Sequence, residues 1–239
     1  MKTKCLPLTV LTLTLIAAAS CPAADSDAKA KITTAAKKLA EQPNYSWVTT
    51  TKEADGSPGR LSNIEGQSDK NALTHLSFAV GGVPVEVYLK GTNGAAKALE
   101  GWMTLDEIAQ TSGTAAAVVK YLRSYKTPSM QSTELAANIK DSKEEDGVLV
   151  AQLDERGFRD LLLLGVRQRE GQEAPKIEDA KGTAKFWSEN GSITKYEINA
   201  QGKVITADRN LDIDRTMTVK IKDAGSTKVE PPDEAKQKL

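Results

Sequence analysis

Residues that build metal centres and nucleophilic catalytic sites are scarce in this sequence. Its 239 residues include one histidine and two cysteines. A site made of histidine and cysteine ligands needs three or four of them, and only one of each remains because Cys5 lies in the apolar segment at the start of the chain. A Ser-His-Asp or Cys-His arrangement would have to use His75, which is expected on the exposed face of a strand, opposite Leu76 and Phe78. We therefore expect no metal, no cofactor and no catalytic residue, and the chain is not expected to be an enzyme.

An excess of charge of one sign is also missing. Lysine plus arginine number 32, and aspartate plus glutamate also number 32. A protein that binds nucleic acid through the phosphate backbone usually carries a clear basic excess. The sequence therefore predicts no nucleic-acid partner.

Long apolar runs are absent except at the start of the chain. Lys2 and Lys4 precede a continuous apolar stretch over residues 6–19. This stretch is shorter than the roughly 20 residues of a membrane-spanning helix, and small residues follow it directly. A basic start, a short apolar segment and small residues are typical of a cleaved secretory signal peptide. Residues 1–20 are predicted to be that signal, so the protein is exported.

The cysteines support lipid attachment at the new N-terminus. Cys5 lies inside the apolar segment, and Cys21 is the only other cysteine. The residues Ala18-Ala19-Ser20-Cys21 resemble a bacterial lipobox, in which the cysteine is acylated, although Ala18 stands where leucine is usual. We predict a lipoprotein on the periplasmic side of the cell envelope, anchored to the membrane through Cys21. The alternative is ordinary cleavage as late as residue 24, which gives a soluble periplasmic protein.

The remaining chain alternates between strand and helix patterns. Apolar spacing predicts a helix over 25–41, and alternation with period two then predicts strands. Thr104 to Glu107 form a capping box that opens a short helix, and Asp154 caps the helix that carries Phe158. The predicted strands are 45–51, 61–66, 73–80, 83–90, 95–99, 148–153, 182–188, 193–200 and 211–222. The other predicted helices are 115–123 and 129–139, with loops at 140–147 and 167–178 and a turn at Gln201-Gly202.

The last strand has the clearest pattern. Leu211, Ile213, Met217, Val219 and Ile221 share one face, and polar residues share the other, which is typical of a half-buried antiparallel strand. Arg215 falls on the apolar face. Its side chain is expected to reach the rim of the sheet or, alternatively, to offer a cation to a lipid headgroup inside the concavity.

Two stretches carry a resemblance to a known family. Residues 182–187, followed by Asn190-Gly191 and residues 195–198, form a charged, aromatic hairpin, and the chain closes with residues 219–229 and Pro231. This order of elements resembles the LolA-like half-barrel lipoproteins, a family that includes LppX and LprG lipid-binding lipoproteins. The resemblance implies an α+β fold in which helices cover the concave face of a curved antiparallel sheet. Residues 25–239 would form one such domain, with a helical segment over 105–164.

The same resemblance implies a binding function rather than a reaction. A lipid or acyl chain, bound or transported, would lie in an apolar cavity between sheet and helices. The predicted ligand-binding residues are Phe158, Leu161, Leu162, Val119, Leu122, Met217 and Arg215. Ordinary core packing is the other interpretation of the apolar ones. The alternative function is a module of the same fold that binds another envelope protein or senses envelope stress. A closed internal cavity would favour lipid, and an exposed apolar patch would favour a protein partner.

Overall fold

The computed structural model describes residues 23–59, 63–98, 101–111, 114–164, 166 and 173–239. The predicted signal peptide and Cys21 lie outside the described residues, so export and acylation stay predictions.

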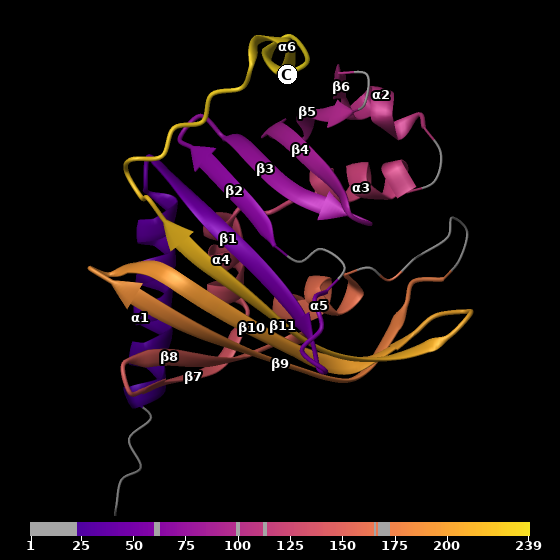
Figure 1. The fold of residues 1–239 in the computed structure, drawn as a ribbon. Helices are drawn as coiled ribbons and strands as arrows, with labels where there is room; N and C mark the ends of the chain where they lie inside the picture. Colours follow the sequence, from indigo (N-terminus) through magenta and orange to yellow (C-terminus); the bar gives the residue numbers. More distant parts are fainter. Residues whose placement is uncertain (1–22, 60–62, 99–100, 112–113, 165, 167–172) are drawn as a thin grey trace, which may run out of the picture.

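Eleven strands form one antiparallel sheet, in the order β6-β5-β4-β3-β2-β1-β11-β10-β9-β8-β7. The sheet curves and does not close (Figure 1). The first and last strands are direct neighbours at its centre, where Trp47 pairs with Ile221 and Glu53 with Arg215. The strands are β1 (Asn44–Glu53), β2 (Ile64–Asp69), β3 (Leu73–Val80), β4 (Val83–Lys90), β5 (Asn93–Ala98), β6 (Gly101–Thr104), β7 (Ile139–Glu145), β8 (Val148–Leu153), β9 (Lys176–Glu189), β10 (Ser192–Ile205) and β11 (Asn210–Lys222).

Helices cover the concave face of this sheet. Helix α1 packs on α4, β7 and β10, and α5 packs on β10, β9 and β11. The helices are α1 (Ala23–Ala40), α2 (Leu105–Ala109), α3 (Thr114–Arg123), α4 (Pro128–Ala137), α5 (Glu155–Leu163) and α6 (Asp233–Lys236). The predicted fold class, a curved antiparallel sheet with helices over its concave face, is confirmed.

Three local predictions were wrong. Residues 140–147 are not a loop, because β7 pairs with β8 along most of this segment. The predicted helical segment 105–164 therefore contains two strands as well as helices. No turn occurs at Gln201-Gly202, because β10 continues to Ile205 and Gly202 pairs with Ile213. The loop predicted over 167–178 ends earlier, since β9 begins at Lys176.

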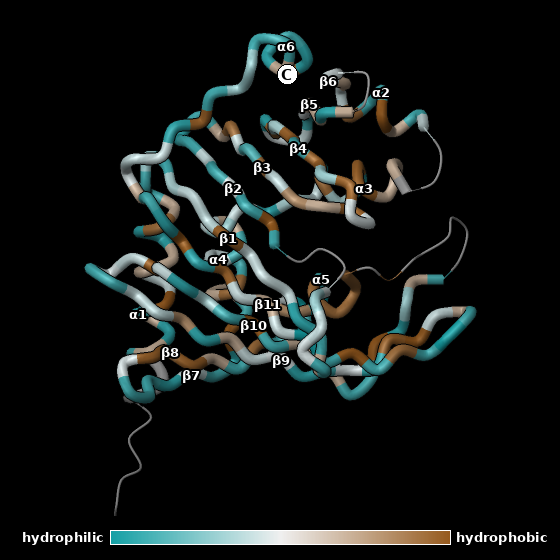
Figure 2. The backbone as a smooth tube through the Cα atoms, viewed as in Figure 1, coloured by the Kyte–Doolittle hydropathy of each residue, from teal (hydrophilic) through white to brown (hydrophobic). Residues whose placement is uncertain are grey.

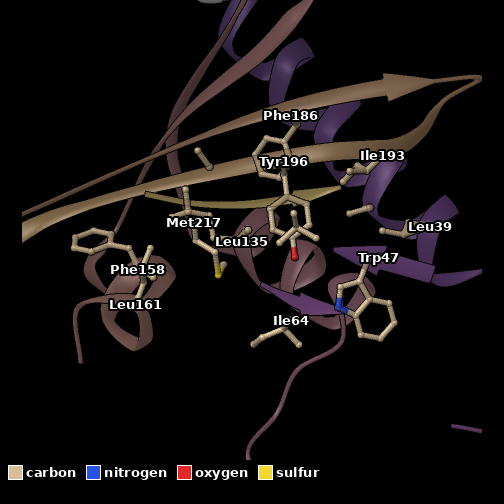
Figure 3. Close-up of a cluster of buried hydrophobic side chains, with 14 of the residues drawn as sticks. Leu39, Trp47, Ile64, Leu135, Phe158, Leu161, Phe186, Ile193, Tyr196 and Met217 are labelled. Atoms are coloured by element: carbon tan, nitrogen blue, oxygen red, sulfur yellow. The ribbon is translucent and has the colours of Figure 1, made fainter. Parts of the chain in front are cut away.

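The main core fills the space between sheet and helices. Its largest fully buried side chains include Trp47 and Tyr196 from the sheet and Leu39, Leu135 and Leu162 from the helices. Figure 3 shows Tyr196 beside Phe186, with Leu135 and Trp47 on either side of the tyrosine ring. One continuous cluster thus joins α1, α4 and α5 to the central strands.

A second, smaller core lies on the convex side and is closed by the end of the chain. Tyr88 and Ala95 point away from the main core and pack with Val229 and Ala235. The Tyr88 hydroxyl donates a hydrogen bond to the Glu230 carbonyl, at 3.4 Å. Residues 228–239 therefore form a strap over β4 and β5 at the top of Figure 1.

Candidate functional site

Helix α5 begins where the sequence places it. The Asp154 carboxylate accepts a hydrogen bond from the Gly157 amide at 3.1 Å, which satisfies a free N–H of the first turn. Burial opposes ionisation of Asp154, but hydrogen bonds from Arg156 and Gly157 outweigh it and lower the pKa of this carboxyl. The helix buries Phe158, Leu161 and Leu162 against the sheet. The prediction that this helix packs on the sheet that contains residues 211–221 is confirmed.

A glycine on β9 brings α5 close to the sheet. A Cβ atom at Gly182 would lie 2.0 Å from Cδ1 of Phe158, so the ring rests directly on the backbone of the strand. Any side chain at this position would push the helix outward.

Arg215 holds the other end of α5. Its Nη1 donates to the carbonyls of Leu161 and Leu164, at 2.9 and 2.8 Å. Its Nε and Nη2 both lie 2.9 Å from Oε1 of Glu53. The guanidinium thus caps the helix C-terminus and pairs with a carboxylate on β1, so the structure gives it protein partners inside the concavity. Its role toward a lipid headgroup stays a prediction.

The other residues predicted to bind a ligand belong to the main core. Val119 and Leu122 on α3, Phe158, Leu161 and Leu162 on α5, and Met217 on β11 are all buried in the main core. This packing is what ordinary core residues show. Their role in ligand binding stays a prediction.

Sequence reasoning missed the group of aromatic hydroxyls inside the concavity. Trp47 Nε1 donates to the Tyr125 hydroxyl at 3.2 Å. The Tyr45 hydroxyl donates to Ser129 Oγ, and that of Tyr196 donates to Gln131 Oε1. Burial raises the pKa of Tyr125 and of Tyr196 well above the ordinary tyrosine value. The hydrogen bonds of Tyr45 and Tyr196 connect α4 to the sheet. The spacing of these residues in the sequence does not predict these contacts.

Two hollows formed by described residues open to solvent at the margins of the sheet. One, of about 300 Å³, lies between Lys38 and Leu39 of α1 and the β9–β10 turn at Asn190. The other lies beside the β3–β4 turn and is lined by Phe78 and Gly82 among others. Neither hollow lies between α5 and the sheet.

Some of the half-buried apolar side chains that pack against the main core come from elements on one side of the molecule, and we call these the apolar rim. They come from the β3–β4 hairpin, from α3, from the end of α5 and from the free end of the β9–β11 strands, which lie on the same side in Figure 1 and include brown segments in Figure 2. The apolar rim consists of Val80, Val85, Val118, Tyr121, Leu163, Leu164, Ile177, Leu211 and Ile213. Nearby Val83 at the hairpin tip is 62% exposed. An apolar molecule could contact the core from this side without entering a closed cavity.

His75 lies on the face opposite Leu76 and Phe78, as expected, but it is not exposed. Its side chain is 20% exposed and stacks on Tyr88, with ring centroids 4.6 Å apart. Its Nε2 is buried, lies 3.3 Å from Oε1 of Glu86 and makes no hydrogen bond. His75 is less exposed than expected because the smaller core and the strap lie beside it on the convex side.

In the part of the chain that the structure describes, no group of three or more potential metal ligands comes together. None of the described helices combines the length and apolar character that a bilayer crossing requires.

No protein-family model matches the chain, and no curated protein matches it. Solved structures with a similar arrangement include the lipoprotein LppX of Mycobacterium tuberculosis, at 10% identity over 88% of this chain and 99% of that one, with a TM-score of 0.46. LprF of Mycobacterium bovis aligns at 9% identity over 87% and 98%, with a TM-score of 0.48. A LolA superfamily protein of Nitrosomonas europaea aligns at 9% identity over 85% and 94%, with a TM-score of 0.36.

Proposed function

We propose that this protein binds a lipid or acyl chain at the apolar rim, in the cell envelope and without turnover. The observation that carries the proposal is that half-buried apolar side chains of six elements on one side of the molecule pack against the main core (Figure 1). Apolar patches on the surface of monomeric soluble proteins often mark a binding site.

The strand register supports binding of an extended acyl chain, because it places apolar side chains of neighbouring strands side by side. On the free end of β9–β11, Ile177 pairs with Val204, and Val204 pairs with Leu211. Ile213 follows two residues after Leu211, so it shares the concave face. Burying an acyl chain along such a surface contributes about 0.8 kcal/mol per methylene, and no catalytic group is needed.

The test compares two acidic substitutions on opposite faces of the same strands. Leu211→Asp places a charge in the apolar rim, whereas Ile205→Asp places one on the convex face. Fluorescent fatty acid is titrated into each variant after its fold has been checked by circular dichroism. We expect the wild-type protein and Ile205→Asp to take up the probe and Leu211→Asp to bind it about tenfold more weakly or worse, because a carboxylate is costly to desolvate. No uptake by the wild-type protein, or equal uptake by both variants, would contradict the proposal. Leu162 is a poor test position because it is fully buried and a charge there would unfold the chain.

A second function, binding of another envelope protein, is favoured by three observations. The apolar rim faces solvent and is not a closed cavity, which is the arrangement expected for a protein partner. The space under α1 and α5 is filled by core side chains. In addition, β9 before Thr183 and β11 before Arg215 each pair only with β10 among the described strands. Such free edges can accept a strand from a partner. If the wild-type protein takes up no fatty acid while Leu211→Asp abolishes capture of an envelope protein, this second function is the correct one.

A further inference from the structure

The convex face of the sheet carries a basic patch whose charges the fold does not neutralise. Lys185 and Trp187 on β9, Lys195 on β10, and Lys220 and Lys222 on β11 form this patch. The strands are adjacent in the sheet, and α1 and α5 pack on the opposite, concave face (Figure 1). Lys185, Lys220 and Lys222 are exposed, and Lys195 and Trp187 are half-buried.

Two of these lysines are direct cross-strand partners. Lys195 on β10 is opposite Lys220 on β11. Like charges directly opposite each other in a sheet are destabilising, and neutral or acidic residues would serve the fold better at either position. On its other side Lys195 is opposite Trp187, and its ammonium lies 3.8 Å from the centre of the indole ring. This cation–π contact holds one of the two like charges in place beside the other.

The patch also lacks counter-charges. None of its four lysines has an ion-pair partner in the described part of the chain, whereas Lys126, Lys143 and Lys176 elsewhere do form ion pairs. Two acidic residues lie beside the patch. Glu197, opposite Lys185, accepts a hydrogen bond from Thr218 at 3.4 Å. Asp223, which follows Lys222, accepts one from Ser46 at 2.7 Å, and neither carboxylate forms an ion pair with a lysine of the patch. The local excess is notable because the whole chain has no net charge. Unpaired lysines on adjacent strands attract an anionic partner.

We propose that this patch docks the protein on an anionic membrane surface. Four cations spread over three strands provide no enclosed site for a small anion, but they match a plane of lipid headgroups. Tryptophan is favoured at membrane interfaces, where its ring is apolar and its N–H is polar, so Trp187 fits the same partner. Docking through this face is separate from the apolar rim and does not depend on ligand binding there.

The test measures binding of the purified full-length protein to two kinds of vesicle. One kind contains phosphatidylglycerol and phosphatidylcholine, and the other contains phosphatidylcholine alone. The readout is the difference between the two, because an N-terminal acyl anchor would bind both. A lysine near an anionic surface contributes roughly a fivefold change in partition. We therefore expect Lys195→Gln/Lys220→Gln to reduce the preference for anionic vesicles by at least tenfold, and added salt to reduce it in the wild-type protein.

The matched control is Lys70→Gln/Lys90→Gln, which removes the same charge from two exposed lysines outside the patch. It should keep the wild-type preference. The proposal is overturned if the wild-type protein shows no preference for anionic vesicles, if the patch variant keeps the preference, or if the control loses it equally. If the wild-type protein ignores the vesicles but binds polyglutamate through the same two lysines, the patch serves an acidic protein and membrane docking is wrong.

Discussion

Arg215 and Glu53 form an ion pair that joins the last strand of the sheet to the first, across 162 positions of sequence. The side chain of Arg215 is 9% exposed and that of Glu53 is 31% exposed. Since the same guanidinium caps the end of α5, this pair connects the sheet centre to the helix that covers it.

Replacing Glu53 alone should lower the free energy of unfolding more than replacing Glu53 and Arg215 together. Glu53→Ala leaves a buried guanidinium without its counter-charge, a loss of about 3 kcal/mol in the free energy of unfolding. Arg215→Met/Glu53→Ala removes the charge altogether and should recover part of that loss. Urea unfolding of the two single variants and the double variant measures the coupling. If the losses in the two single variants sum to the loss in the double variant, the ion pair itself contributes nothing to stability.

Gly182→Ala should loosen α5. The added methyl group would collide with Phe158, at a cost of about 1–3 kcal/mol. In a Phe158→Ala background the same substitution should be nearly neutral, because the ring that it meets is gone. Urea unfolding midpoints of the wild-type protein, the two single variants and the double variant test this. If Gly182→Ala destabilises the Phe158→Ala protein as much as the wild type, contact with the ring is not the cause.

Stability should fall in alkaline solution because of the buried tyrosines. Burial raises the pKa values of Tyr121, Tyr125 and Tyr196 in the folded chain. Above an unfolded tyrosine pKa of about 10, the unfolded chain releases protons that the folded chain retains, so rising pH favours unfolding. Ultraviolet absorbance during an alkaline titration should therefore show these tyrosines ionising together with loss of circular dichroism. The variant Tyr125→Phe removes one of them and should unfold at a higher pH, provided that its stability at neutral pH is matched.

Cys21→Ser should release the protein from the membrane. The prediction depends on the lipobox-like residues before Cys21, since acylation needs the thiol. Metabolic labelling with palmitate and membrane fractionation of both chains are the measurements. Equal labelling and equal location would favour ordinary signal cleavage and a soluble protein.

The spacing of apolar residues in the sequence predicted most of the helices and strands. The prediction failed where a segment of loop-like or turn-like composition pairs with a neighbouring strand. Residues 140–145 carry five charged side chains and were interpreted as a loop, yet they form an edge strand, where charged side chains face solvent and discourage further pairing. Gln201-Gly202 has the composition of a turn, but both neighbouring strands continue past it. In such places the partner strand decides the structure.

The candidate site was predictable only in part. The leucines of α5 and the apolar face of β11 follow from spacing, and the structure places them together. The sequence marks Arg215 as unusual on that face but cannot indicate that Glu53 is its partner. The apolar rim likewise depends on six elements that only the tertiary fold brings to one side.

The pairing of β1 with β11 has a consequence for how the chain reaches this structure. Because Trp47 pairs with Ile221, β1 has no neighbour on that side until β11 has been synthesised. A chain that emerges from its N-terminus exposes this unpaired, partly apolar strand edge until nearly all of it has been delivered. We therefore expect slow, cooperative folding and a chain that stays open during passage through a narrow channel, which is the state that export of an unfolded polypeptide requires.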